Sequence, residues 1–265
     1  MHVYTVSLKG ARPQNEDNHI VFKNLDNNDP NFKDVDLFGV FDGHGGKQVS
    51  SYIKDNLPRF LIDKKIDYPI SKKYVSDLYD HLQTCLKGFK FSYTSGSTGL
   101  VVIRYNLGGK QYINVINNGD CRLILCRDNF AMPLTKDHKP MWPEEKCRIE
   151  KLGGKIEWDG HDWRIGNLSV SRAFGDCDSQ PFVTHRPELL RYELNSCDKF
   201  IVLACDGLYD VLQNHDIVNF ILLNCYDCTG KRINQTVNIA KKLGEHAIEK
   251  HSSDNISVIV VFLDE

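Results

Sequence analysis

Residues 37–46 have the sequence Leu37-Phe38-Gly39-Val40-Phe41-Asp42-Gly43-His44-Gly45-Gly46. Short apolar runs bounded by turn-forming residues are typical of buried strands, and here an Asp stands at the strand end. The same design recurs twice, where residues 200–205 lead into Asp206-Gly207 and where Asp254-Asn255 leads into residues 256–262. A carboxylate at a buried strand end is costly unless it meets a cation or hydrogen-bond donors. Three such ends predict carboxylates gathered around hard metal ions, which commonly serve hydrolytic or phosphoryl chemistry.

The composition is that of an ordinary globular protein. The 265 residues are 41% hydrophobic and 26% charged, and the net charge is −2. Nothing in this balance favours nucleic acid or an anionic membrane as a partner. The longest apolar run, residues 256–263, is too short to span a bilayer, and the start Met1-His2-Val3-Tyr4 lacks the plan of a signal peptide. We therefore expect an intracellular protein, cytoplasmic or nuclear or both, without a transmembrane segment.

The nine cysteines are odd in number and irregular in spacing. This pattern favours reduced, mostly buried thiols over a disulfide framework. The only Cys-x-x-Cys pair is Cys225 and Cys228, and no second pair accompanies it. Because structural zinc takes four ligands, a zinc site here is not favoured.

The pattern of apolar residues predicts a single domain, residues 1–265, without repeats or long linkers. Strands are expected at residues 3–8, 20–22, 35–41, 100–105, 112–116, 123–126, 200–205 and 256–262. Helices are expected at residues 49–61, 74–89, 144–152, 214–223 and 233–249. This order is not the strict alternation of a parallel sheet. It predicts an α+β sandwich, in which pairs of helices pack on antiparallel β-sheets.

The Asp-Gly pairs are the strongest chemical signal. Gly43 lets the backbone approach a ligand closely and leaves its carbonyl accessible, because glycine has no Cβ. Asp42 could then bridge two ions while the Gly43 carbonyl binds one of them. The alternative is a glycine-rich turn that caps the next helix, with His44 as part of that cap. The residues themselves leave both interpretations open.

Taken together, the ordered motifs resemble those of the metal-dependent protein serine/threonine phosphatases of type 2C. The resemblance runs nearly end to end. The motifs that carry it are Arg12 with Asn15-Glu16-Asp17, Asp42-Gly43-His44-Gly45-Gly46, Ser95-Gly96-Ser97-Thr98, Gly119-Asp120-Cys121-Arg122, Asp137-His138-Lys139-Pro140, Ser171-Arg172-Ala173-Phe174-Gly175-Asp176, Asp206-Gly207-Leu208-Tyr209-Asp210 and Ser253-Asp254-Asn255. The resemblance implies two stacked antiparallel sheets flanked by helix pairs, a binuclear Mg²⁺ or Mn²⁺ centre at one end, and a flap at about residues 141–175.

The resemblance also implies the roles of the acidic residues. Asp42 corresponds to the carboxylate that bridges both ions. The remaining assignments are Asp206 and Asp254 on the first ion, Glu16 and the carbonyl of Gly43 on the second, Asp17 in the outer shell, and Asp137, with Asp206 and Asp210, at a weaker third site. The expected cofactors are thus two Mg²⁺ or Mn²⁺ ions per chain, with a weaker third.

By the same resemblance, Arg12 clamps the substrate phosphate and His44 is the general acid. The implied reaction is direct hydrolysis of phosphoserine and phosphothreonine by a water or hydroxide that bridges the two ions, without a phosphoenzyme. Phosphorylated proteins are the expected substrates, and the chain is expected to act as a monomer. Whether Trp158 and Trp163 of the flap touch substrate or only pack the flap stays open, as does a purely surface role for Arg12.

Three departures from the family pattern fall at packing positions, namely Gly99, Cys121 and Tyr209. One alternative is a pseudophosphatase adaptor of the same fold, but its signature would be a lost acidic ligand, and every ligand position is filled. Another is an aspartyl-phosphate hydrolase of a different fold. That chemistry typically uses Asp-x-Asp, whereas Asp42 is followed by Gly43-His44.

Overall fold

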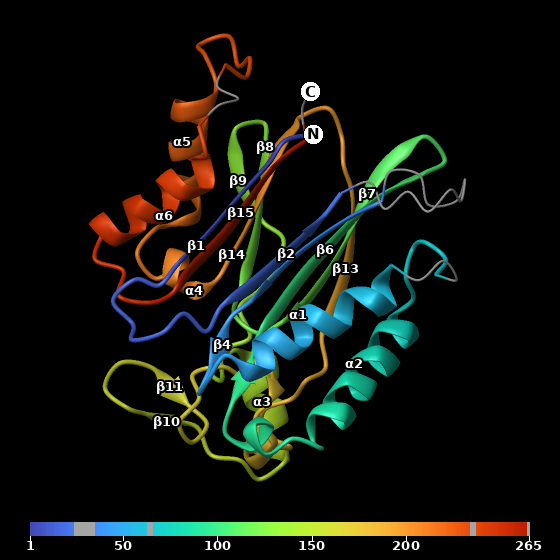
Figure 1. The fold of residues 1–265 in the computed structure, drawn as a ribbon, viewed down its shortest axis with the longest axis vertical. Helices are drawn as coiled ribbons and strands as arrows, with labels where there is room; N and C mark the ends of the chain where they lie inside the picture. The colour runs from blue at the N-terminus through green and yellow to red at the C-terminus, as the bar shows by residue number, and fades with distance from the viewer. Residues whose placement is uncertain (24–34, 63–65, 234–236, 264–265) are drawn as a thin grey trace.

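Two five-stranded antiparallel sheets stack face to face in the computed structural model (Figure 1), which describes residues 1–23, 35–62, 66–233 and 237–263. The first sheet has the order β1 (Val3–Leu8), β15 (Ile256–Phe262), β14 (Asp198–Ala204), β8 (Arg122–Arg127) and β9 (Phe130–Pro133). The second has the order β13 (Glu188–Glu193), β7 (Lys110–Asn118), β6 (Gly99–Leu107), β3 (Asp36–Phe41) and β2 (Asn18–Phe22). Neighbouring strands within each sheet are antiparallel.

The core lies between the two sheets and on their outer faces. In β14, Ile201 and Leu203 belong to the apolar cluster between the sheets, together with Val102 and Leu125 of other strands. The alternate residues of β14 belong to the cluster beneath the helices. Since successive side chains on a strand point to opposite faces, a strand covered on both sides becomes continuously apolar.

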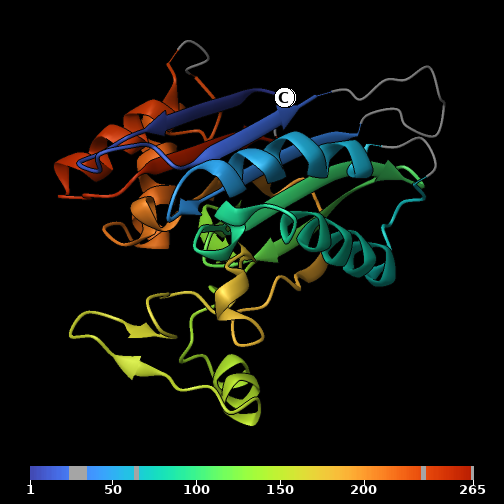
Figure 2. The ribbon, with the colours of Figure 1, turned by 60° about the horizontal axis from the view of Figure 1, so that its bottom comes forward.

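Helix pairs cover both outer faces (Figures 1 and 2). The second sheet is covered by α1 (Gln48–Leu61) and α2 (Lys72–Leu86), and the first by α5 (Asn214–Cys225) and α6 (Ile239–Glu249), with the short α4 (Asp206–Tyr209) beside them. The Ser71 side chain accepts a hydrogen bond from Tyr74 N at the start of α2, which satisfies one of its unpaired amides. The predicted α+β sandwich of two antiparallel sheets flanked by helix pairs is therefore confirmed. Among the described helices, none has the length and apolarity needed to cross a membrane.

A small sheet and a projecting segment lie at one end of the sandwich. The small sheet has the order β12 (Phe174–Gly175), β5 (Gly96–Ser97) and β4 (Gly43–His44). Within residues 141–175, α3 (Pro143–Lys151) and the ribbon of β10 (Glu157–Trp158) and β11 (Trp163–Arg164) extend away from the main sheets (Figure 2). Ile149, Ile165 and Val170 of this segment form a separate apolar cluster with Ala173 and Val183. We call residues 141–175 the flap. Two 3₁₀ turns, η2 (Lys90–Tyr93) and η3 (Cys177–Ser179), flank the small sheet.

The structure differs from the expected elements at sheet edges and at helix ends. Strands β9 and β13 were not expected, because both are edge strands whose half-exposed residues give a weak apolar pattern. The last long helix begins at Ile239 rather than residue 233. Asn238 caps it by accepting a hydrogen bond from Lys241 N. Residues 234–236 of the expected helix lie outside the described residues.

We predict that Leu125→Ala destabilises the protein far more than Leu223→Ala does. Leu125 is fully buried between the sheets, whereas Leu223 on α5 is 83% exposed. The buried change leaves a cavity and lowers the free energy of unfolding by about 2–5 kcal/mol. The exposed change lowers it by less than about 0.5 kcal/mol. Urea unfolding followed by circular dichroism measures both values, and equal losses would contradict the assigned core.

Candidate metal centre

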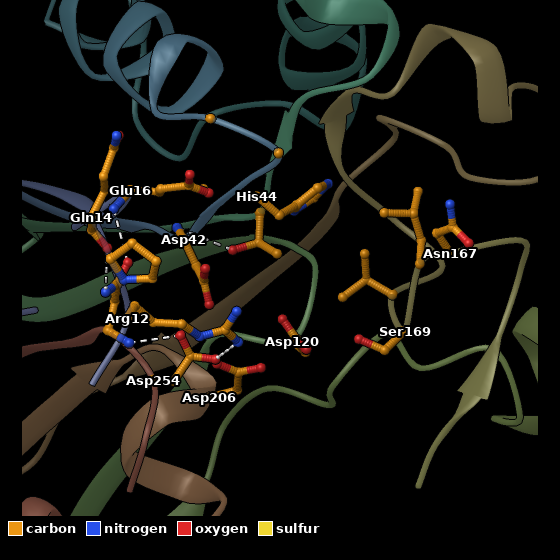
Figure 3. Close-up of a pocket in the computed structure, with 18 of the residues that line it drawn as sticks. Arg12, Gln14, Glu16, Asp42, His44, Asp120, Asn167, Ser169, Asp206 and Asp254 are labelled. Carbon is orange, nitrogen blue, oxygen red and sulfur yellow. Dashed lines mark hydrogen bonds and ion pairs between the residues drawn. The ribbon is translucent and has the colours of Figure 1, made fainter. Parts of the chain in front are cut away.

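Seven of the expected site residues line one cavity of about 550 Å³ at the end of the sandwich where β3 and β14 end (Figure 3). These seven residues come from four distant parts of the chain. They are Arg12, Glu16, Asp42, Gly43, His44, Asp206 and Asp254. The flap supplies the opposite wall, through Arg164, Asn167, Leu168, Ser169 and Val170. The predicted carboxylates at strand ends therefore meet at a single cavity.

Asp42 lies at the centre of the acidic residues. One carboxylate oxygen from each of Asp42, Asp120 and Asp206 lies within 4.8 Å of the others. A second group joins Asp42 to Asp17 and to the Cys205 sulfur within the same distance. Asp42 thus takes part in both groups, which is the position that a carboxylate shared by two ions needs.

Glycines allow remote backbones to meet around Asp42 and Asp206. A Cβ on Gly43 would collide with the carbonyl oxygen of Glu16, and a Cβ on Gly207 would collide with the carbonyl oxygen of Asn255. Each Asp-Gly pair therefore requires glycine at its second position, because a side chain there would clash with a neighbouring backbone. Helix α1 begins later, after Lys47, and no side chain caps it. The cap interpretation of Asp42 and His44 is thus not what the structure shows.

Asn255 ties the loop of Arg12 and Glu16 to the start of β15. Its side-chain oxygen accepts a hydrogen bond from Glu16 N at 2.8 Å. Its amide group donates to the carbonyls of Lys9 at 2.8 Å and Gln14 at 3.0 Å. The sequence pattern assigned Asn255 no role of its own, although Asn255 directly follows Asp254. These contacts hold Glu16 beside the cavity.

Burial and mutual repulsion act on the carboxylates of the cluster. Burial, with the charge of Asp206 next in size, holds the pKa of Asp42 well above its ordinary value. The pKa of Asp206 is raised in the same direction by burial and by Asp120. Burial also raises the pKa of Asp17 to about 6. Repelling carboxylates in a buried site favour either protonation or a bound cation.

The residues present fit a pair of hard cations. Both oxygens of the Asp17 carboxylate are buried, and neither accepts a hydrogen bond of good geometry. A cation with its coordinated water would satisfy such an acceptor. The oxygen-rich set formed by Glu16, Asp42, Asp206 and Asp254 suits Mg²⁺ or Mn²⁺.

Two basic side chains contact the cluster. Arg12 Nη2 lies 2.5 Å from Asp254 Oδ2, and Lys139 Nζ lies 2.5 Å from Asp120 Oδ2. The Arg12 side chain is 57% exposed, so it lies at the open side of the cavity. The Lys139 side chain is 27% exposed and neutralises part of the charge of Asp120. The sequence patterns gave no role to Asp120, which lies in the turn after β7, or to Lys139, which lies two residues after Asp137.

Asp137, expected at a third metal site, is engaged elsewhere. Its carboxylate forms two hydrogen bonds with Arg122, at 2.6 and 3.0 Å. Arg122 also lies over the ring of Tyr209, 4.4 Å from its centroid, and the Tyr209 hydroxyl donates to the Arg122 carbonyl. The structure thus brings Asp120, rather than Asp137, next to Asp206. It also shows Tyr209 as a packing residue.

His44 lies on β4 with its ring in the cavity wall, and its Nε2 is 2.7 Å from Asp176 Oδ2. Burial disfavours a charged imidazole, but the hydrogen bond to Asp176 and its negative charge outweigh burial. The pKa of His44 is therefore raised above its ordinary value. A histidine that holds its proton beside an acidic cavity can act as a general acid. His138, by contrast, accepts a hydrogen bond from Gly119 N and fixes that turn.

The structure is an α+β sandwich with a cavity lined by carboxylates at one end, and the comparisons identify its family. The model of the family described as protein phosphatase 2C matches residues 1–256. The chain therefore belongs to the protein phosphatase 2C family.

Individual relatives agree with this assignment. A PP2C-like domain-containing protein of Acanthamoeba polyphaga mimivirus is 46% identical over 177 residues, covering 60% of this chain and 99% of that protein. A probable mitochondrial protein phosphatase 2C (member 13) of Oryza sativa is 38% identical, covering 86% of this chain and 60% of its own length. The solved structure of a C. elegans sex determining protein superposes with a TM-score of 0.87 at 27% identity, covering 99% of this chain and 65% of that one. The chain thus spans about two thirds or less of the rice and nematode proteins.

We predict that metal-free protein becomes more stable as the pH falls from 7 to 5, and that Asp17→Asn weakens this dependence. An unfolded Asp titrates near pH 3.9, whereas the pKa of folded Asp17 is about 6. Between these values the folded state binds more protons than the unfolded state, so lowering the pH stabilises the fold. Thermal unfolding in the presence of a chelator, repeated between pH 5 and 7, measures how the melting temperature of each protein changes with pH.

The control for this prediction is a divalent cation. Adding Mn²⁺ at pH 7 should raise the melting temperature of the wild type, because the ion binds only the folded state. Identical pH slopes for the wild type and Asp17→Asn would show that the buried carboxylate does not destabilise the metal-free fold.

Proposed function

We propose that this protein hydrolyses phosphoserine and phosphothreonine in proteins, with two Mg²⁺ or Mn²⁺ ions at the acidic cavity. The observation that carries the proposal is the convergence of Glu16, Asp42, Asp206 and Asp254, from four separate segments, on one cavity. Membership of the phosphatase family supports the same reaction. The pseudophosphatase alternative has no support, because no acidic ligand position is lost.

In this proposal Asp42 would contact both ions, Asp206 and Asp254 would hold the first, and Glu16 and the Gly43 carbonyl would hold the second. Asp17 lies behind them in the outer shell. When bound, the two ions supply a nucleophile at neutral pH by lowering the pKa of water, and they neutralise charge on the phosphate. The weaker third site at Asp137 stays a prediction. In this structure the Asp137 carboxylate accepts a hydrogen bond from Arg122.

Arg12 binds the substrate phosphate, and His44 donates a proton to the leaving group. The Arg12 guanidinium, at the open side of the cavity, offers parallel donors to two non-bridging phosphate oxygens. His44, in the cavity wall, gives its proton to the oxygen of the departing serine or threonine, which is strongly basic. The flap residues Asn167 and Ser169 line the cavity on the side away from Arg12 and Asp254 (Figure 3).

The proposal extends to partners. Phosphorylated proteins are the substrates, and the chain acts as a monomer, because one chain supplies every residue of the site. The expected intracellular location, and the expectation of neither nucleic acid nor membrane as a partner, stay predictions from the sequence.

We predict that hydrolysis of a phosphothreonine peptide requires Mn²⁺ or Mg²⁺ and is lost in chelator. Asp206→Asn should lower kcat/KM by about 10³-fold or more, because the variant removes a charged ligand and its share of transition-state stabilisation. Asp77→Asn, on the exposed face of α2, is the matched control and should keep wild-type activity. Phosphate release measures the rates. Hydrolysis that survives chelator, or a trapped phospho-Asp42, would refute direct metal-dependent hydrolysis.

Arg12→Ala should raise the KM for the phosphothreonine peptide by about 10- to 100-fold, the value of one charge-assisted contact of 1.5–3 kcal/mol. Arg12→Lys should recover part of the loss, since an ammonium keeps the charge without the paired donors. Steady-state kinetics at saturating Mn²⁺ separates this effect from weakened metal binding through Asp254. An unchanged KM in Arg12→Ala would assign Arg12 to the surface.

A further inference from the structure

We propose that Asp176 is a positioning residue that orients the His44 imidazole for proton delivery to the leaving group. The inference rests on the proposed phosphatase function and adds a residue to which neither the sequence motifs nor the family match gave a role. Asp176 follows β12, 132 residues after His44 in the chain. Its Oδ2 lies 2.7 Å from His44 Nε2.

The small three-stranded sheet brings the pair together. His44 lies on β4 and Asp176 directly follows β12, the two outer strands, while Gly96 lies on the central strand β5 opposite both His44 and Gly175. A Cβ on Gly96 would collide with Asp176 Oδ2 and with His44 Nε2. The two side chains therefore meet over a strand position that must have no side chain.

The backbone around Asp176 is held in an uncommon conformation. Asp176 has a φ of 45°, in the left-handed region, and is only 3% exposed. Its N–H donates to the Ser95 carbonyl at 3.0 Å. The buried Gln83 side chain holds Gly175 by accepting from its N–H at 2.9 Å and donating to its carbonyl at 2.8 Å. Such strained, well-supported positions in non-glycine residues are concentrated at functional sites.

The pair determines which nitrogen serves the substrate. With Nε2–H donated to Asp176, Nδ1 is the nitrogen that carries the transferable proton. As the bond from phosphorus to the serine or threonine oxygen breaks, its electron pair stays on that oxygen, which takes the Nδ1 proton. Water supplies the oxygen that bonds to phosphorus and releases its own proton to solvent. His44 is left neutral, with Nε2–H still bound to the carboxylate, and is reprotonated from solvent.

The test compares two substrates that differ in their need for a proton. A threonine alkoxide needs protonation to depart, whereas p-nitrophenolate departs without it. The measured quantity is the ratio of kcat for a phosphothreonine peptide to kcat for p-nitrophenyl phosphate, both with Mn²⁺. We expect Asp176→Asn to lower this ratio by about 10-fold or more, since proper general-acid catalysis contributes 10²–10⁴-fold. A partial loss of folded enzyme cancels from the ratio.

Further variants separate positioning from a structural role. His44→Ala should lower the ratio at least as much as Asp176→Asn, and the double variant should lose no more than His44→Ala alone, because both act through one imidazole. Gly96→Ala should also lower the ratio by displacing the pair. Asp178→Asn, an exposed change two residues away, is the matched control and should keep the wild-type ratio.

Two results would overturn the inference, namely equal losses on both substrates in Asp176→Asn, and losses that multiply in the double variant with His44→Ala. Either would leave the proposed function standing, provided that the wild type hydrolyses both esters. A wild type that hydrolyses neither ester with Mn²⁺ would refute the proposed function itself.

Discussion

Repulsion among buried carboxylates at one end of the sandwich is the constraint to which the surrounding structure responds. Asp42 and Asp206 leave strands of different sheets, yet their oxygens and that of Asp120 lie within 4.8 Å of one another. At the reduced dielectric of a protein interior such like charges repel strongly. Arg12 and Lys139 offset part of this repulsion through Asp254 and Asp120. A bound cation would offset more of this repulsion, which makes the cluster a candidate metal site.

This constraint explains why the sandwich carries the carboxylates while the flap supplies only a wall of the cavity. Metal ligands must keep their positions to within fractions of an ångström, and strand ends anchored in a doubly covered sandwich meet that need. Residues 141–175 instead pack around their own small cluster and supply only one wall of the cavity. A wall built in this way can vary between relatives without disturbing the ligands. The small sheet of β4, β5 and β12 joins the two regions, since it carries both Gly43 and His44 and ends next to Asp176.

Two residues that differ from the expected family pattern, Tyr209 and Cys121, make packing and hydrogen-bond contacts next to the cavity. Tyr209 donates its hydroxyl to the Arg122 carbonyl and presents its ring to the Arg122 guanidinium, and Arg122 in turn binds Asp137. The Cys121 sulfur lies 3.2 Å from the Thr98 hydroxyl, which in turn accepts a hydrogen bond from Asp42 N at 3.3 Å. These substitutions change how the floor of the site is held together. They leave every carboxylate of the expected metal centre in the chain.

The sequence alone determined the sandwich, because doubly covered strands are continuously apolar and the helices between them are amphipathic. It also indicated Asp42, Asp206 and Asp254 as candidate metal ligands, since they stand at ends of such strands, and the structure brings these three to one cavity. It left out the edge strands β9 and β13, whose half-exposed residues give no clear alternation. Only the tertiary structure showed that Asp120 lies beside Asp206, that Asp137 is bound by Arg122, and that Asp176 contacts His44 across Gly96. These contacts join residues up to 132 positions apart, and local patterns cannot specify them because strand pairing and loop closure decide which side chains meet.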